Sequence, residues 1–552
     1  MIDRKPRIIR PWIIVALIGL PVLCVVSFGK RWWSGSRVGP PNNPNPINGE
    51  YDFEATKWSV HREQTPELDH RVNPNKTRRA SPQEGENEMD ETQNNWIRER
   101  ATNFVSSESD APLTDDERAA VDRMVGEAPV VAIGEATHGS KEIIQSRERV
   151  LRFLIQERQA TIVVLEACFA ATQLLNRYVV HGDGTAQEAL VATAYWSCAN
   201  LETLGFVDWL RNCNRTHPAA NPPVRIHGCD VQSIDGPKTE LARLLQGYGR
   251  TGRFSPEDVT EATALLTALP ADRDLFRFVE LLVSEASSNN PDEARIANIQ
   301  AQQSALMTTA RASVDKFSRR MQEVQQVLFS TVPDDDRFVF ERCRRLLEQV
   351  IEFYSPGGLE KRDLFMAENV TALSRQFPRE KLLLLFHNLH IVRVPLRIRG
   401  QPFLPMGCLL ARRLGNDYRA IGSAFHQGKY LAVAGDRPEE DQIAVAHTPG
   451  PLAFEHILQR VADDRQTAGL LLDLNERVAQ RNEFPWQTGL EMRIGEAGAQ
   501  GDYDASFMHQ RPELQFDGLI FLKETTPISV LQDYYQHANE KWQETNRGGG
   551  NQ

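Results

Sequence analysis

The feature that most constrains the fold of this chain is a series of short, unbroken apolar runs separated by stretches with helical periodicity. Between the first two runs, the segment 141–158 (KEIIQSRERVLRFLIQER) repeats apolar residues at helical spacing. Apolar runs without polar alternation are typical of strands covered on both faces, as in parallel sheets. The sequence therefore predicts an α/β fold with a mainly parallel sheet flanked by helices. The predicted strands are 129–135 (PVVAIGE), 161–167 (TIVVLEA), 224–231 (VRIHGCDV), 381–391 (KLLLLFHNLHI), 418–425 (YRAIGSAF) and 516–524 (FDGLIFLKE).

Strand-like runs stop between about residues 241 and 360. Long polar segments with Ala and Leu, such as IANIQAQQSALMTTARASVDKFSRRMQEVQQVLF, favour helices there. Because the strand pattern resumes directly afterwards, we expect an α-helical insertion or cap subdomain that shapes the mouth of a cleft. The simpler alternative is a helical hairpin with no role in a site. Candidate apolar walls of the cleft, although such aromatic residues more often belong to a core, are Trp196, Phe206, Trp209, Phe329 and Phe353.

The first part of the chain differs from the rest. Basic residues precede an uncharged apolar run, Pro11 to Gly29, that approaches the length needed to cross a bilayer as a helix. Residues 1–33 are therefore expected to be a membrane anchor or a signal segment, and the small residues near Gly29 leave cleavage open. Residues 34–95, rich in Pro, Asn, Gly and charge, are expected to be a disordered linker. The folded domain is expected over 96–542, outside the cytoplasm, with a flexible tail over 543–552.

Composition and missing motifs exclude several classes of function. The chain has 63 Lys+Arg against 74 Asp+Glu, so no basic footprint for a nucleic-acid partner is present. Its seven cysteines have no C-x-x-C spacing, which fits neither a disulfide scaffold nor a zinc ribbon. Without a Walker A loop or a G-x-G-x-x-G motif, no nucleotide cofactor is expected. Without a G-x-S-x-G motif, a serine esterase of the α/β-hydrolase type is disfavoured.

Acidic residues and histidines gather at the ends of the predicted strands, where open α/β sheets bind their ligands. Any one of them alone is more often a capping or core group. Together they must pair with one another, because a buried unpaired charge costs several kcal/mol. Paired groups in a cleft are where shifted pKa values arise, as catalysis requires. These strand-end residues are Glu135, His138, Glu166, Asp230, His387 and His390.

Several motifs occur in order between about residues 120 and 530. They are IGEATHGSKE, VVLE, YWSCANLETLGFVDWLRNCN, GCDVQ, KRDLFMAENV, LLFHNLHIVR and FDGLIFLKETTP. By these motifs the chain resembles the erythromycin esterase family over nearly all of its expected globular part. The resemblance implies a hydrolase that opens macrolide lactones without a metal and uses a histidine to activate water. Carried over residue by residue, the motifs imply the catalytic residues His138, Glu135, Arg147, Glu166, Arg362, His387 and His390.

The chemistry of these residue types suits ester hydrolysis independently of the family. The pKa of an imidazole lies near neutrality, so His138 is the expected general base that deprotonates the attacking water. A carboxylate on the other ring nitrogen would fix the tautomer, and either Glu135 or Glu166 can serve. Glu135 can instead share the water.

The arginines and the remaining histidines have more than one possible role. Arg147 and Arg362 either hold the carboxylates in place or offset the oxyanion of the tetrahedral intermediate, and His387 or His390 could donate to the same oxyanion. A structural ion pair is an equally good interpretation of either arginine.

Two other functions stay open. Glu135-x-x-His138 and His387-x-x-His390 could ligate a divalent metal or haem, although neither pair has the H-E-x-x-H arrangement on a helix. The chain could also be a non-catalytic member that binds an envelope glycan or other ligand, because family likeness indicates fold better than substrate. The membrane-directed N-terminus sets the chain apart from cytoplasmic resistance esterases. A native envelope ester is therefore as plausible a substrate as a macrolide antibiotic.

Overall fold

The structure is a computed structural model of the whole chain. It describes residues 92, 94–216, 222–286, 288, 291–329, 332–398, 401–432, 442–446, 449–450, 453–475, 490–493, 507–534 and 536. The expected membrane segment 1–33 and tail 543–552 lie outside these residues, as does nearly all of the expected linker. Across the described ranges, none of the helices combines the length and apolar character that a membrane crossing requires.

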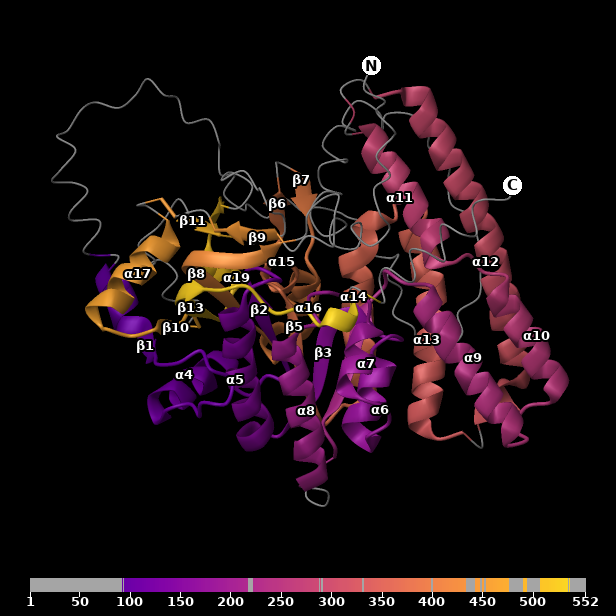
Figure 1. Cartoon of the computed structure of the whole chain (residues 1–552), viewed down its shortest axis with the longest axis horizontal. Helices are drawn as coiled ribbons and strands as arrows, with labels where there is room; N and C mark the ends of the chain where they lie inside the picture. Colours follow the sequence, from indigo (N-terminus) through magenta and orange to yellow (C-terminus); the bar gives the residue numbers. More distant parts are fainter. Residues whose placement is uncertain are drawn as a thin grey trace.

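The centre of the molecule is a sheet in the order β1-β10-β13-β8-β2-β5-β3-β4, with β9 paired to the end of β8 (Figure 1). Two small antiparallel pairs, β6 with β7 and β11 with β12, lie apart from it. The strands are β1 (Ala101–Phe104), β2 (Val130–Glu135), β3 (Ala160–Cys168), β4 (Arg225–Asp230), β5 (Lys381–His387), β6 (Leu396–Ile398), β7 (Gln401–Phe403), β8 (Tyr418–Ala432), β9 (Gln442–Val445), β10 (Gly469–Asp473), β11 (Leu490–Arg493), β12 (Phe507–Gln510) and β13 (Gly518–Thr525).

The mainly parallel α/β fold is confirmed. Neighbouring strands are parallel all the way from β13 to β4, and the residues of β2 are buried without exception, as expected of a strand covered on both faces. The sequence missed β1 and β10. β1 pairs antiparallel with β10, and β10 pairs antiparallel with β13. The predicted strand 381–391 is too long, because β5 ends at His387 and the next four residues form a helical turn.

Helices surround the sheet, and α5 covers 141–158 as predicted. It packs on β2, β3 and β13, whereas α14 packs on β4 and α16 on β8. The helices are α4 (Asp115–Val125), α5 (Lys141–Arg158), α6 (Gln173–His181), α7 (Ala186–Val191), α8 (Leu201–Thr216), α9 (Asp235–Arg250), α10 (Pro256–Thr267), α11 (Asp272–Ala286), α12 (Glu293–Phe329), α13 (Asp334–Phe353), α14 (Arg362–Gln376), α15 (Asn388–Ile391), α16 (Met406–Leu414), α17 (Phe454–Asp464) and α19 (Pro512–Gln515), with 3-10 turns η2 (Leu359–Lys361) and η3 (Gly415–Asp417).

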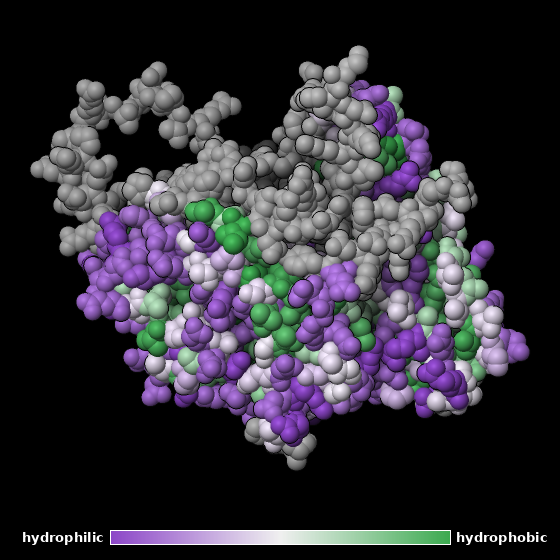
Figure 2. Space-filling view, in the orientation of Figure 1, coloured by the Kyte–Doolittle hydropathy of each residue, from purple (hydrophilic) through white to green (hydrophobic). Residues whose placement is uncertain are grey.

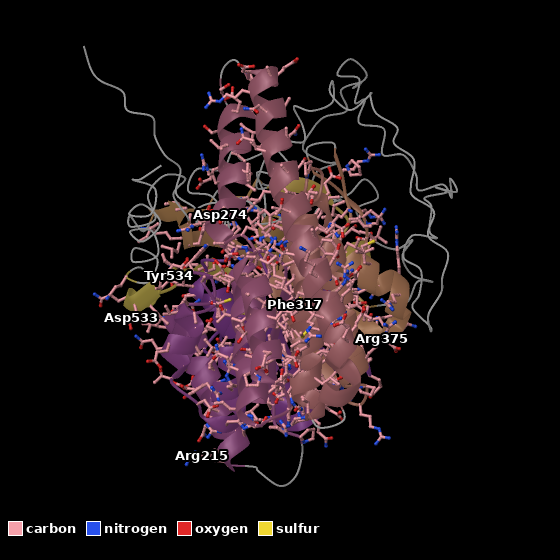
Figure 3. The ribbon with its side chains drawn as sticks, turned by 90° about the vertical axis from the view of Figure 1, so that its right-hand side faces the viewer. Arg215, Asp274, Phe317, Arg375, Asp533 and Tyr534 are labelled. Atoms are coloured by element: carbon pink, nitrogen blue, oxygen red, sulfur yellow. The ribbon has the colours of Figure 1, made fainter. Side chains whose placement is uncertain are left out.

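Helices α9 to α13 follow β4 in the chain and stand beside the sheet as a group (Figure 1). Their packing is apolar: the buried ring of Phe317 on α12 lies 6.4 Å from the ring of Phe340 on α13, among the helices that face the viewer in Figure 3. The helical character expected for 241–360 is therefore present. Because α9 begins before residue 241, at Asp235, the helical group starts slightly earlier than the sequence pattern indicates.

One buried polar residue interrupts the apolar pattern of β4. His227 is 2% exposed, and its ring lies between Phe169 at 5.6 Å and Phe377 at 5.9 Å, nearly parallel to both. Neither ring nitrogen has a hydrogen-bond partner among the described residues. Burial, with a contribution from Arg225, lowers the pKa of His227 to about 3. The imidazole is therefore neutral and packs as an aromatic core residue.

The face of the molecule shown in Figure 2 is mostly hydrophilic. In the space-filling view, hydrophobic residues on the displayed face gather mainly near its middle (Figure 2). The apolar side chains of the strands and of the helix faces toward them form one continuous core.

Candidate active site

The centre of the site lies where β2, β5 and β3 end. These strands are neighbours in the sheet, and Glu135 at the end of β2 is in register with His387 at the end of β5. Glu166 lies near the end of β3, which pairs with the other edge of β5. Because the three strands are parallel, their polar ends meet at one edge of the sheet. The convergence expected from the sequence is present.

His138 is held by Glu135. The Nδ1 atom of His138 lies 2.6 Å from Glu135 Oε1, and the other carboxylate oxygen lies 2.5 Å from Arg147 Nη2 on α5. Burial would raise the pKa of Glu135, but the Arg147 charge and the hydrogen bond with His138 hold that pKa below its ordinary value. Burial would lower the pKa of His138, but the hydrogen bond and charge of Glu135 raise it above 6.5. The carboxylate is thus ionised and accepts the Nδ1 proton of the imidazole.

The turn that carries His138 is fixed by two distant segments. The carbonyl of Gly139 accepts hydrogen bonds from the backbone N–H groups of Leu431 and Ile528, both at 3.0 Å. A Cβ atom at residue 139 would lie 1.9 Å from the Leu431 carbonyl oxygen, so this close approach requires glycine. The side chain of Glu142 accepts from both the backbone N–H and the hydroxyl of Thr526. The position of the imidazole therefore depends on the end of β8 and on the segment after β13.

His387 presents an unused donor beside His138. The two ring centroids are 5.0 Å apart. The backbone N–H of Leu389 donates to His387 Nδ1 at 3.3 Å, so the ring proton must reside on Nε2. His387 Nε2 is buried and has no partner in the described part of the chain. Burial, reinforced by the charge of His138, lowers the pKa of His387 to about 3, so the ring is neutral.

Glu166 and Arg362 form a second buried group behind the histidines. One oxygen of Glu166 accepts from the backbone N–H of His387 at 2.8 Å, and the other lies 2.9 Å from Arg362 Nη2. Arg362 also binds both carboxylate oxygens of Asp230, at 3.1 and 2.7 Å. Burial would raise the pKa of Glu166, but His390 and Arg362 lower it well below the ordinary value. The carboxylate of Glu166 is therefore ionised, and Arg362 joins it to Asp230.

His390 completes this group. Its Nδ1 atom is 2.8 Å from Asp363 Oδ1, and its Nε2 atom is 3.4 Å from Glu166 Oε1. The same oxygen of Asp363 accepts from the backbone N–H of Met406 at the start of α16. Burial would lower the pKa of His390, but the charges of Asp363 and Glu166 raise it. His390 Nε2 also lies 3.3 Å from Arg362 Nη1, so both ring nitrogens are engaged within this group.

The seven site residues expected from the sequence form one connected set. The structure also answers which glutamate holds His138: Glu135 does, whereas Glu166 pairs with Arg362 and His387. Two members, Asp230 and Asp363, were not among the expected catalytic residues. Asp363 follows Arg362 directly in the RD pair, and Asp230 ends the third predicted strand, so both signals were available.

A pocket opens beside His138, between β3, α5 and α8. Apolar and polar side chains share its wall, and the edge-on ring of Trp196 lies 6.2 Å from the His138 ring. The pocket is lined by Glu135, His138, Ile144, Arg147, Glu148, Leu151, Leu165, Glu166, Ser197, Cys198, Thr203, Phe206, Ile226 and Leu385.

The aromatic walls expected from the sequence are only partly present. Phe206 lines the pocket, and Trp209 stacks behind it at 5.8 Å. Phe353 is instead fully buried against Tyr354, because α13 turns this side chain into the helical core. The side chain of Phe329 lies outside the described residues.

Over the residues that the structure describes, no group of three or more His, Cys, Asp or Glu side chains is arranged to hold a metal ion. The six cysteines in these ranges are free.

Two relatives from Escherichia coli are similar in sequence. Erythromycin esterase type II is 23% identical over 349 residues, 61% of this chain and 78% of that protein. Erythromycin esterase type I is 24% identical over 307 residues, 53% of this chain and 69% of that protein.

Solved structures share the fold at lower identity. A Bacillus cereus protein has a TM-score of 0.63 and 18% identity over 80% of this chain and 99% of its own. A succinoglycan biosynthesis protein has a TM-score of 0.59 and 19% identity over 81% of this chain and 98% of its own. A mutant of erythromycin esterase EreC in its open conformation has a TM-score of 0.53 and 19% identity over 77% of this chain and 98% of its own.

The sequence profile named erythromycin esterase matches residues 155–525. This span contains Glu166, Arg362, His387 and His390. Glu135, His138 and Arg147 precede it. Because the match covers more than half of the sequence and the relatives agree with it, the chain belongs to the erythromycin esterase family and is an esterase.

Proposed function

We propose that this protein hydrolyses a carboxylic ester or lactone of macrolide type without a metal, and that His138 activates the attacking water. The observation that carries the proposal is the 2.6 Å contact between His138 Nδ1 and Glu135. Since the ionised carboxylate requires a proton on Nδ1, the lone pair of the neutral ring is on Nε2. His138 also lines the pocket. A water bound at Nε2 can therefore give its proton to the ring as it attacks the acyl carbon.

The developing negative charge needs a donor, and His387 supports that role. Its Nε2–H group is buried and unpaired within the described residues, and its ring lies 5.0 Å from the ring of His138. A neutral imidazole fixed by Leu389 and Glu166 requires no reorganisation when the carbonyl oxygen becomes an oxyanion. His387 is thus the proposed oxyanion donor, and His390, engaged at both nitrogens, is a positioning residue.

The two arginines are proposed to position the acids. Arg147 binds Glu135, and Arg362 binds Glu166 and Asp230. Removing either cation would leave a buried carboxylate without compensation. Metal independence is supported by the same pairings, because the oxygens of Glu135 and Glu166 are already bound by protein groups.

A panel of esters tests this function directly. The metal-depleted full-length protein is incubated with erythromycin and with simple aryl esters in ¹⁸O-water, and the first-turnover products are analysed by mass spectrometry. We expect one ¹⁸O atom in the carboxylic acid and none in the alcohol, since water attacks the acyl carbon. Label in the alcohol, an unlabelled first acid product, or activity that returns only when a divalent metal is added would contradict the proposal.

The location of the enzyme is a separate proposal. The basic residues and the apolar run within 1–33 support attachment to a membrane or export through it. Fractionation of cells after protease treatment of intact spheroplasts tests this. Protection of the folded domain from protease would contradict a location outside the cytoplasm.

A further inference from the structure

Glu148 is a buried acid in the pocket that the proposed mechanism does not use. It follows Arg147 on α5 and is 4% exposed. Ile144, Glu148 and Leu151 recur at helical spacing, so one face of α5 faces the pocket and carries a single carboxyl group between two aliphatic side chains. On the side of α5, the pocket thus carries a carboxyl group flanked by two aliphatic side chains.

The nearby arginines of α5 are engaged elsewhere, and Arg149 pairs with the buried Glu117. Arg147 pairs with Glu135 at 2.5 Å, and the guanidinium of Arg152 lies 4.9 Å from the centre of the Trp209 ring. No ion pair to Glu148 forms among the described residues. On α8, Glu202 faces it as a like charge, and the hydroxyl of Ser109 donates a hydrogen bond to it.

Burial decides the charge of this acid. It raises the pKa of Glu148 to about 8, and the attraction of Arg152 and Arg147 only partly opposes it, while Glu202 adds to the rise. Glu135 and Glu166 line the same pocket and are ionised, so they do not favour a further negative charge there. At neutral pH the carboxyl group of Glu148 is mainly protonated and can donate as well as accept.

We propose that Glu148 is a specificity-determining residue that presents a neutral carboxylic acid to the pocket and donates a hydrogen bond to an oxygen atom of the bound ester. The inference rests on the proposed ester hydrolysis and adds a substrate class to it. That class is an oxygen-rich ester with a hydroxyl, ether or carbonyl group beyond the scissile bond. An aliphatic ester without such oxygens would leave the buried donor unpaired and bind more weakly.

Two substitutions at residue 148 distinguish a neutral hydrogen-bond donor from a negatively charged carboxylate at this position. Glu148→Gln keeps a donor and the shape but cannot ionise, whereas Glu148→Leu removes the donor. With erythromycin as the oxygen-rich probe, we expect Glu148→Gln to keep KM within about 2-fold and Glu148→Leu to raise it by roughly 10-fold, the loss of one buried hydrogen bond. With p-nitrophenyl butyrate, which has no oxygen in its acyl chain, we expect Glu148→Leu to change KM little.

Two kinetic outcomes would overturn the inference. Equal losses in Glu148→Gln and Glu148→Leu would mean that a negative charge is required, as for a cationic substrate group. An unchanged KM for erythromycin in Glu148→Leu would mean that the side chain does not contact the ester. Binding of intact erythromycin to His138→Ala, with and without Glu148→Leu, gives the same comparison without turnover, so a failure of the proposed catalysis is distinguishable from a failure at residue 148.

Protein stability provides a test that needs no substrate. The pKa of Glu148 is higher in the folded state than its ordinary 4.5, so the folded state binds more protons and wild-type stability falls as pH rises between these values. Relative to Glu148→Gln, the unfolding constant of the wild type should rise on the order of 50-fold from pH 5.5 to 7.5. A constant ratio across this range would show an ionised carboxyl and would overturn the inference whatever ester is cleaved.

Discussion

Replacement of the buried His227 by Phe should make the stability of the folded protein less sensitive to acid. The folded state cannot protonate this ring until the pH approaches 3, whereas the unfolded chain protonates it near the ordinary value of 6.5. Between these values the unfolded state binds more protons, so stability is lost as the pH falls through 6.5.

The size of the effect follows from the same two values. Between pH 8 and pH 5, protonation of this one residue in the unfolded state raises the unfolding equilibrium constant by a factor of about 30. This corresponds to a loss of about 2 kcal/mol of stability. The result depends little on the folded-state pKa, because that value is already well below pH 5. A phenyl ring at this position would keep the stacking on Phe169 and Phe377 and would have no proton to bind.

Urea unfolding of the full-length protein in mild detergent at pH 5 and pH 8, followed by circular dichroism, measures the difference. His227→Phe should lose about 2 kcal/mol less than the wild type between the two pH values. The larger phenyl ring can change the absolute stability, but that change is the same at both pH values. His181→Phe, at an exposed position on α6, is the matched control and should follow the wild type. Equal pH dependence of His227→Phe and the wild type would refute the reasoning.

Three further predictions concern the site. Arg362→Met leaves Asp230 and Glu166 buried without their cation, so we expect a loss of about 3–5 kcal/mol in urea unfolding at pH 7; an unchanged midpoint would contradict the pairing. Glu142→Ala removes both hydrogen bonds to Thr526 and should lower kcat several-fold with little change in KM, whereas the exposed Glu157→Ala on the same helix should not. Glu135→Gln removes the charge that raises the pKa of His138, so the acidic limb of the kcat/KM profile should move to lower pH and its plateau should fall; a limb that stays in place would mean that another group titrates.

Much of the fold could be predicted because its strands are buried on both faces. The runs VVAIG and LLLLF are apolar throughout, and β2 and β5, which they form, are adjacent in the sheet. β1 and β10 were missed because both are short, and their antiparallel pairing depends on tertiary contacts. The four residues after His387 were predicted as strand because they are apolar enough for either state, and their helical turn is set by Glu166 and the His387 ring.

The sequence could predict that acidic residues and histidines lie at the strand ends. It could not predict which side chain each of them contacts. No sequence spacing distinguishes Glu135 from Glu166 as the partner of His138, because the choice depends on how β2 and β3 flank β5. The role of Asp363 is equally hidden, since it depends on the position of His390 and the start of α16. Phe353 was misplaced because its orientation follows from the packing of α13 against other helices.

The rate of ester hydrolysis by His138→Ala tests the central claim most directly. We expect kcat/KM for an ester that the wild type cleaves to fall by about 10²–10⁴-fold, because the water loses its general base, while the unfolding midpoint stays close to that of the wild type. Activity within a few-fold of the wild type in a folded His138→Ala protein would contradict the account.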